Sequence, residues 1–150
     1  NYSRDITTPY SGNAEDLNRY LKGKGVLSGQ GQAFIDAQNK YGISAAVLAG
    51  IAISESGGTS SLARKRFNVT SISSSRGWRR FNNGSECIDY TASMLANRYV
   101  KNSGLSGVSL KTLYQINAKY CPVSDTRNNS SNNRFWAQNV ENKVREIEKA

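Results

Sequence analysis

Histidine is absent from this 150-residue chain, and cysteine occurs only twice. Without histidine there is no Ser-His-Asp or Cys-His nucleophile system and no metal site with histidine ligands. Two cysteines cannot form a zinc site by themselves. We therefore expect no metal and no cofactor. Hydrolytic chemistry is left to carboxylates, tyrosines and hydroxyls, which favours acid catalysis on an acetal over proteolysis.

Long apolar runs are also missing. No stretch approaches the roughly 20 apolar residues that cross a bilayer, and no signal peptide stands at the amino terminus. Because the chain starts at Asn1 and not at Met, we expect a processed product or a piece of a longer protein. The length predicts one domain with a single core. We assign this domain to residues 13–150, after a polar arm or linker at residues 1–12.

Acidic residues are scarce relative to basic ones. Twenty Lys and Arg against eleven Asp and Glu give a net charge of +9 and a pI near 9.8. This charge favours anionic surroundings, either nucleic acid or an acidic cell-wall polymer. No DNA- or RNA-binding motif is present. The basic residues are not arranged along one helix with aromatic residues between them. The bases in the middle of the chain are Arg64, Lys65, Arg66, Arg76, Arg79 and Arg80. Nucleic acid is therefore the less favoured partner.

One apolar helical stretch ends on a carboxylate. Helical spacing places Glu55 on the same stripe as four apolar residues, namely Val47, Leu48, Ile51 and Ala52. Ser44 is the expected N-cap, and Gly57 is the expected left-handed residue that ends the helix. The negative end of the helix dipole and the apolar flank both raise the pKa of Glu55, as a general acid at neutral pH requires. The alternative is a half-exposed glutamate that merely finishes a helix.

The remaining pattern is mainly α-helical. It predicts about six helices around one core and one small β-hairpin. Residues 69–72 and 78–81 are rich in strand formers and bracket the expected turn at residues 73–77. Ser85 is the expected cap of a long helix over residues 86–101. The other helices are expected over residues 14–21, 30–41, 110–119 and 134–149, and residues 61–67 are expected to form a brief helical turn.

Two motifs follow the apolar helix, Glu55-Ser-Gly-Gly-Thr-Ser-Ser-Leu-Ala63 and Asn68-Val-Thr-Ser-Ile72. They resemble the bacterial cell-wall glucosaminidases of glycoside hydrolase family 73. Residues 22–31, 34–44 and 48–53 are also similar, and a looser similarity covers residues 20–148. The resemblance implies a lysozyme-like α fold with a small hairpin beside an active-site cleft. Residues 13–150 would then form a lysozyme-like glucosaminidase domain that hydrolyses peptidoglycan glycan strands.

The same resemblance assigns roles to particular residues. Glu55 takes the place of the family's general acid, Asn68 matches the asparagine after the acid-bearing helix, and Tyr120 aligns with a tyrosine near the cleaved bond. Three hairpin residues, Thr70, Ser71 and Trp78, would line one wall of the sugar groove. Trp78 or Phe81 would stack on a pyranose ring. The alternative for these hairpin residues is ordinary packing on the core.

The chain departs from the family pattern in three places. At Gly57-Gly58 the segment is one residue short and lacks a sugar-stacking aromatic. After Tyr120 the family's short loop is replaced by residues 121–125. No Asp or Glu lies between Glu55 and Glu86, so the expected second carboxylate is missing. Asp125 is the remaining candidate, and otherwise the substrate's own N-acetyl group or a sugar hydroxyl attacks the anomeric carbon.

Other functions remain open at the level of sequence. One alternative is a muramidase or lytic transglycosylase of the same superfamily, which cleaves the other glycan linkage. Another is a wall-binding module that has the fold but no catalytic activity. We expect a monomer that acts outside the cytoplasm, secreted, at the cell wall or in a phage particle. Its partners would be glycan strands and anionic wall polymers such as teichoic acids. Cys87 and Cys121 are either bridged or two separate thiols.

Overall fold

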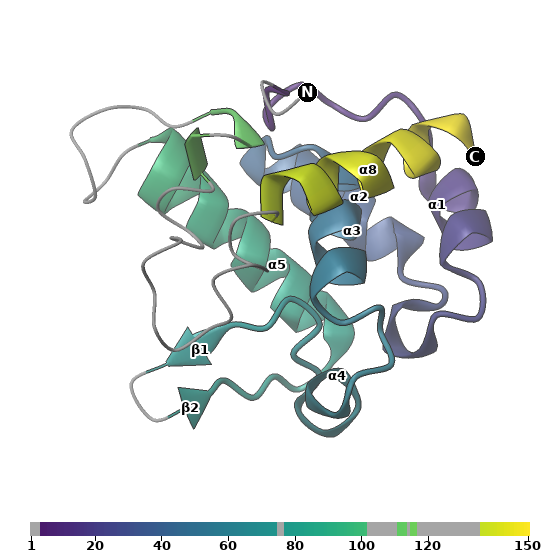
Figure 1. The fold of residues 1–150 in the computed structure, drawn as a ribbon, viewed down its shortest axis with the longest axis vertical. Helices are drawn as coiled ribbons and strands as arrows, with labels where there is room; N and C mark the ends of the chain where they lie inside the picture. Colours follow the sequence, from purple (N-terminus) through teal and green to yellow (C-terminus); the bar gives the residue numbers. More distant parts are fainter. Residues whose placement is uncertain (1–3, 75–76, 102–110, 114, 117–135) are drawn as a thin grey trace.

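The computed structural model describes residues 4–74, 77–101, 111–113, 115–116 and 136–150. Six α-helices lie in these ranges: α1 (Ala14–Leu21), α2 (Gly31–Tyr41), α3 (Ala45–Glu55), α4 (Ser61–Arg66), α5 (Gly84–Met94) and α8 (Trp136–Lys149). A 3-10 turn, η1 (Gly25–Leu27), precedes α2, and a π-helical segment, η2 (Leu95–Val100), continues α5. The strands β1 (Ser73–Ser74) and β2 (Gly77–Trp78) form an antiparallel hairpin. The predicted mainly α fold is confirmed (Figure 1).

Helix α3 is the centre of the core. Every residue from Ala45 to Ala52 is buried, so this helix is covered all round and not along one stripe as its pattern predicted. Helix α8 packs across it (Figure 1). A Cβ built on Gly50 would lie 3.0 Å from Val144 Cγ2 and 3.2 Å from the Val140 carbonyl oxygen. The small residue therefore allows the two helices to approach closely.

Helix ends follow the local signals in the sequence. Asn13 and Asp16 form a capping box at the start of α1. The Ser44 hydroxyl accepts a hydrogen bond from the Val47 amide at 3.3 Å and caps α3, as predicted. Gly57, at φ 63°, is the left-handed residue after α3, also as predicted. None of the described helices is both long and apolar enough to cross a membrane.

The hairpin and the start of α5 differ from the sequence prediction. The strands are Ser73–Ser74 and Gly77–Trp78. Trp78 was expected in a strand, whereas the other three residues were expected in the turn. Val69 and Ile72 are strand formers, but both are buried at the base of the hairpin and lie outside its two strands. Asn83, not Ser85, caps α5, because its side-chain oxygen accepts from the Glu86 amide at 2.9 Å.

Residues 4–10 pack along the core. Ile6 is fully buried, its amide donates to the Lys111 carbonyl at 2.8 Å, and its carbonyl accepts from the Ser44 amide at 2.7 Å. The side-chain oxygen of Gln38 accepts from the amides of both Tyr10 and Ala45 at 2.8 Å. The segment is thus tied to α2 and to the start of α3. The division into an arm and a domain stays a prediction.

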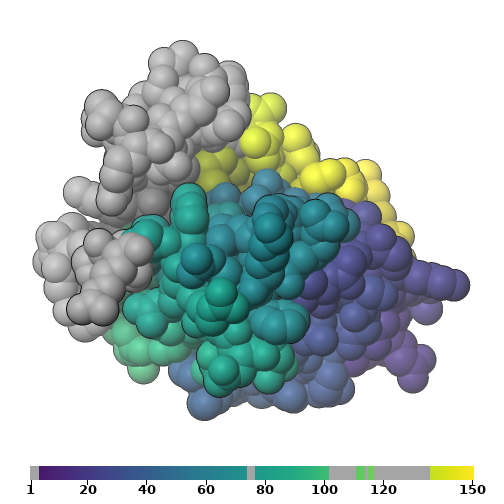
Figure 2. Space-filling view, turned by 90° about the horizontal axis from the view of Figure 1, so that it is seen from below, coloured from purple at the N-terminus to yellow at the C-terminus, as the bar shows by residue number. Residues whose placement is uncertain are grey.

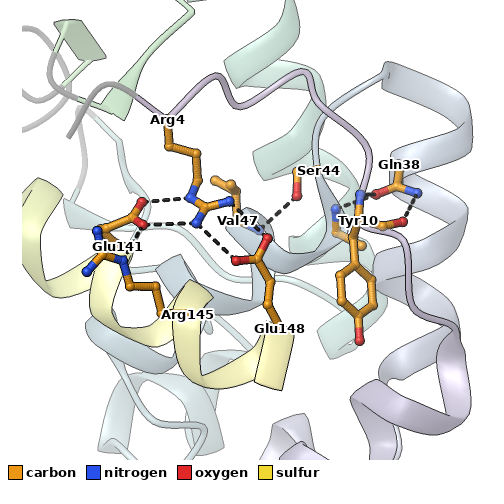
Figure 3. Close-up of polar contacts among 9 residues, drawn as sticks. Arg4, Tyr10, Gln38, Ser44, Val47, Glu141, Arg145 and Glu148 are labelled. Carbon is orange, nitrogen blue, oxygen red and sulfur yellow. Dashed lines mark hydrogen bonds and ion pairs between the residues drawn. The ribbon is translucent and has the colours of Figure 1, made fainter. Parts of the chain in front are cut away.

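Arg4 joins this segment to α8 (Figure 3). Its guanidinium donates to both carboxylate oxygens of Glu141, at 2.7 and 2.9 Å, and to both oxygens of Glu148, at 3.0 Å each. Arg145 also donates to Glu141, at 2.9 Å. Burial would raise the pKa of Glu141, but the hydrogen bonds from Arg4 and Arg145 outweigh it and hold this pKa below its usual range. The hydrogen bond to Glu141 raises the pKa of Arg4.

Candidate active site

Glu55 is the last residue of α3, and its side chain is partly buried. The indole Nε1 of Trp136, the first residue of α8, donates a hydrogen bond to Glu55 Oε2 at 3.2 Å. Burial raises the pKa of Glu55 to about 7, against the opposing effect of this hydrogen bond. Near neutral pH a large fraction of Glu55 therefore carries a proton that it can donate.

Trp136 was not predicted to be a site residue. It is only 5% exposed and lies 81 positions from Glu55 in the chain. The sequence predicted that it lies in the last helix, over residues 134–149. It carries no local signal that an indole there would reach the carboxylate, because that contact depends on how α8 crosses α3.

Ser56 ties the end of α3 to the base of the hairpin, and it too was missed. Its hydroxyl donates to the Val69 carbonyl at 2.7 Å and accepts from the Gly58 amide at 3.0 Å. The residue after Glu55 thus fixes both the turn that leaves α3 and the start of the 69–72 segment. This bond explains how the hairpin is held next to the candidate acid.

Gly58 explains the shortened segment after Glu55. It is buried at φ 78°, and its carbonyl accepts from the Val26 amide at 2.9 Å. A Cβ on Gly58 would lie 1.9 Å from the Lys24 carbonyl oxygen and 3.1 Å from the Leu27 amide nitrogen. The backbone around η1 therefore fills the space next to this turn, where a side chain does not fit.

Replacing Gly58 by alanine is expected to destabilise the fold by about 2–4 kcal/mol, because the positive φ is strained and the new Cβ meets backbone atoms. Gly23 is the matched control: it has the same φ of 78°, and no heavy atom lies within 4 Å of the position that a Cβ would take there. Gly23→Ala should therefore cost only about 1–2 kcal/mol. Urea unfolding of both variants measures the difference, and equal losses would contradict the close approach at Gly58.

Asn68 is fully buried and bonded within the protein. Its amide nitrogen donates to the carbonyls of Ile72 at 2.8 Å and Arg79 at 2.9 Å, and its side-chain oxygen accepts from the Ile72 amide at 2.8 Å. These bonds close the 68–72 turn and join it to the chain after β2. This arrangement favours a positioning role for Asn68 over direct sugar contact.

Among the other predicted wall residues, Thr70 and Phe81 are buried. The Thr70 hydroxyl hydrogen-bonds with the Thr91 hydroxyl at 2.7 Å and lies 3.3 Å from the Cys87 sulfur. Both residues therefore pack the base of the hairpin. Trp78 is 48% exposed, and Ser71 is partly exposed with a positive φ of 59°, which is uncommon outside glycine. Ser71 and Trp78 are the two available to contact a ligand.

Tyr120, Asp125 and Cys121 lie outside the described residues, and Cys87 is a buried free thiol. Within the described ranges there is no group of three or more His, Cys, Asp or Glu side chains that could hold a metal ion.

A shallow depression of about 300 Å³ lies between α2 and the start of α5, and Glu55 is not among its lining residues.

A protein-family comparison matches most of this chain. The glucosaminidase family, described as mannosyl-glycoprotein endo-β-N-acetylglucosaminidase, matches residues 31–149. The chain belongs to this family. The resemblance found in the sequence is therefore confirmed, and the matched region includes both Glu55 and Trp136.

Curated relatives of this glucosaminidase chain are much longer proteins. It is 37% identical over 99 residues to the bifunctional autolysin of Staphylococcus epidermidis, which is 64% of this chain and 7% of that protein. It is 43% identical over 60 residues to the bifunctional autolysin of Staphylococcus aureus, which is 39% of this chain and 5% of that protein. The chain thus spans only a small part of the curated relatives it matches.

Solved structures share the glucosaminidase chain's fold. One is the crystal structure of a catalytic mutant of S. aureus Autolysin E in complex with the disaccharide NAG-NAM, with a TM-score of 0.78 and 22% identity. Another is Autolysin E in complex with the muropeptide NAM-L-Ala-D-iGlu, with a TM-score of 0.76 and 22% identity. Each match covers 99% of this chain and 72% of the other chain. This likeness confirms the lysozyme-like architecture.

Proposed function

We propose that this chain is an endo-β-N-acetylglucosaminidase that hydrolyses peptidoglycan glycan strands with Glu55 as general acid. The observation that carries the proposal is a partly exposed carboxyl group with a pKa of about 7, at the end of a buried helix in a glucosaminidase-family chain. A carboxyl group of this acidity is suited to protonating a leaving sugar at neutral pH.

In this mechanism Glu55 donates its proton to the bridging oxygen as the bond from that oxygen to the anomeric carbon breaks. The leaving sugar departs with a new hydroxyl group. Glu55, now a carboxylate that accepts the Trp136 N–H, then takes a proton from the attacking water. That water adds to the anomeric carbon, and the acid is regenerated.

The source of the nucleophile separates two routes. Among the described residues, burial and Trp136 act on the pKa of Glu55, and no second carboxylate contributes. This supports attack on the anomeric carbon by the carbonyl oxygen of the substrate's N-acetyl group, followed by water. Asp125, outside the described residues, is the candidate if a protein carboxylate acts. Because no second carboxylate acts on Glu55 among the described residues, a lytic transglycosylase is the second candidate function.

The choice of peptidoglycan rests on the relatives. The curated relatives are named autolysins, and Autolysin E has been crystallised with NAG-NAM and with a muropeptide. The family's description names a mannosyl-glycoprotein substrate class instead. We further propose that the chain acts as a monomer outside the cytoplasm, and that anionic wall polymers such as teichoic acids are partners.

Product analysis tests this function. Purified peptidoglycan and a high-mannose glycoprotein are digested with the chain, and the products are identified by mass spectrometry. We expect muropeptides with N-acetylglucosamine at the reducing end and no release from the glycoprotein. A reducing-end muramic acid would identify a muramidase, an anhydro-muramic end a lytic transglycosylase, and no product a wall-binding module. Each of these outcomes overturns the proposal.

Replacing Trp136 by phenylalanine is expected to move the alkaline limb of the kcat/KM pH profile upward by about one pH unit, because a hydrogen bond that stabilises the ionised form of Glu55 is lost. The acid must be protonated to act, so a higher pKa extends activity to higher pH. The matched control is Trp78→Phe, an exposed tryptophan on the hairpin, which should leave the limb unmoved. A downward shift in the Trp136 variant would contradict the assigned hydrogen bond.

A further inference from the structure

The segment between Glu55 and Glu86 has six basic residues and no acidic one. Elsewhere in the described structure, five basic residues each lie within 4 Å of a carboxylate, namely Arg4, Arg19, Lys40, Lys143 and Arg145. The middle segment has no acidic residue of its own, so it carries a local excess of positive charge.

Five of these bases are described and exposed. Arg64, Lys65 and Arg66 form the last turn of α4, and Arg79 and Arg80 follow β2. We call these five residues the cationic face. No ion pair joins any of them to a carboxylate of the described residues. Arg79 lies over the Tyr90 ring, 4.7 Å from its centroid, so its charge is not neutralised.

Backbone contacts hold the two parts of the cationic face together. The Phe81 amide donates to the Arg66 carbonyl at 2.8 Å, and Arg80 Nη1 donates to the Lys65 carbonyl at 3.0 Å. Arg66 Nη1 donates to the Trp78 carbonyl at 3.2 Å. The end of α4 and the chain after β2 are therefore fixed side by side. The teal residues at the centre of Figure 2 show this face of the molecule.

Local structure accounts for only part of this arrangement. The three bases on α4 complement the negative end of its helix dipole. Arg80 bonds to the Lys65 carbonyl in the last turn of α4 and Arg79 lies over the Tyr90 ring, but neither meets an opposite charge among the described residues. Placing both beside three like charges costs electrostatic free energy in the isolated protein. A polyanion that lies across both parts would relieve this repulsion.

We propose that the cationic face binds a linear phosphodiester polymer of the cell wall, a polyol phosphate without nucleobases. The choice of a wall polymer rests on the proposed function. The face itself presents guanidinium and ammonium groups for phosphates, with Trp78 as the one large apolar side chain exposed among the described residues. Binding to single-stranded nucleic acid would need a series of stacking aromatics, which this face lacks.

Binding is tested with the full chain and poly(glycerol phosphate) as the probe, by calorimetry or fluorescence anisotropy. With three to five phosphate contacts, raising the salt from about 50 to 200 mM should weaken binding by about 20- to 100-fold. The variant Arg64→Gln/Lys65→Gln/Arg79→Gln removes three charges and spares the two arginines whose guanidinium groups bond to backbone carbonyls. We expect it to bind at least tenfold more weakly than the parent at low salt.

The matched control, Arg98→Gln/Lys101→Gln/Lys149→Gln, removes the same charge from exposed residues outside the cationic face. It should bind within twofold of the parent. If both variants bind the polymer equally more weakly than the parent, net charge alone explains the binding. If the parent does not bind the polymer, the cationic face is not a binding site for it. Either result overturns the proposal. Tighter, face-dependent binding of oligo(dT) would identify nucleic acid instead and also overturn it.

Activity on phosphate-free glycan strands is measured in parallel and should be unchanged in both variants. Failure of this proposal is therefore distinguishable from failure of the proposed function. If the chain binds the polymer but releases no sugar, the polymer-binding proposal holds and the proposed enzymatic function is wrong. If the chain cleaves glycan strands but does not bind the polymer, the enzymatic function holds and the polymer-binding proposal is wrong.

Discussion

Replacing Glu55 by glutamine is expected to lower kcat on purified peptidoglycan by about 10²- to 10⁴-fold, the usual contribution of a general acid. Glutamine keeps the size of the side chain and can still accept the Trp136 N–H, but it has no acidic proton to transfer. The measurement is the rate at which reducing ends are released from purified walls. KM should change little, because the variant keeps the shape of the site.

The same variant is expected to gain stability at alkaline pH. Because the folded pKa of Glu55 is about 7 and its unfolded pKa is lower, the folded state binds more protons between these two values. Its stability therefore falls as pH rises through this window, as the buried carboxyl is forced to ionise. A neutral glutamine avoids this cost, and at pH 8 the free energy of unfolding should increase by about 2 kcal/mol.

Glu15→Gln is the matched control, because Glu15 is an exposed glutamate in the first turn of α1. It should keep parental activity and show no comparable gain at pH 8. An inactive Glu55→Gln that is also less stable at pH 8 would point to misfolding and not to the loss of an acid. Parental activity in Glu55→Gln would remove Glu55 from the mechanism.

Replacing Glu141 by glutamine is expected to destabilise the fold by about 2–3 kcal/mol at pH 7, toward the lower end for breaking a buried ion pair. The side chain of Glu141 is only 4% exposed and accepts from both Arg4 and Arg145. The loss of stability is moderated because Arg4 still forms its ion pair with Glu148. Urea unfolding at pH 7 measures the effect. Glu148→Gln is the control, since it removes a carboxylate from the same arginine at an exposed position and should cost clearly less.

The pH dependence gives this prediction a second test. The folded pKa of Glu141 lies below its unfolded value, so its contribution is fully present above about pH 4–5 and is lost as pH falls through the folded pKa. The difference between parent and Glu141→Gln should therefore shrink on acidification. A difference that stays constant down to pH 3 would show that shape, and not charge, explains the loss.

Local sequence signals predicted most of the helices. Asn13 and Ser44 cap α1 and α3 through side-chain bonds to residues three positions on, and Gly57 takes the left-handed conformation that ends α3. These signals depend on neighbours in the chain, so they can be read without a structure. The strands were misplaced because Val69 and Ile72 are apolar for a different reason: they fill the core beneath the hairpin.

The candidate acid was predictable, but its surroundings were not. Glu55 stood out because it ends an apolar helix and matches a family motif. The indole of Trp136 and the hydroxyl of Ser56 take part through tertiary contacts, one from a helix 81 positions away and one across a turn to Val69. Asn68 and Thr70 matched the motif as well, and only packing reveals that their polar atoms are bonded internally.

The helix that supplies Trp136 also carries Glu141, whose partner Arg4 lies 137 positions earlier. Closing so long a loop is entropically costly, and contacts between distant residues form late. Helix α8 packs across α3 and brings the Trp136 N–H to Glu55. We expect a truncated polypeptide that lacks α8 to expose part of α3 and to lose this hydrogen bond, so the proposed proton donor reaches its folded environment only when the last of the described helices docks.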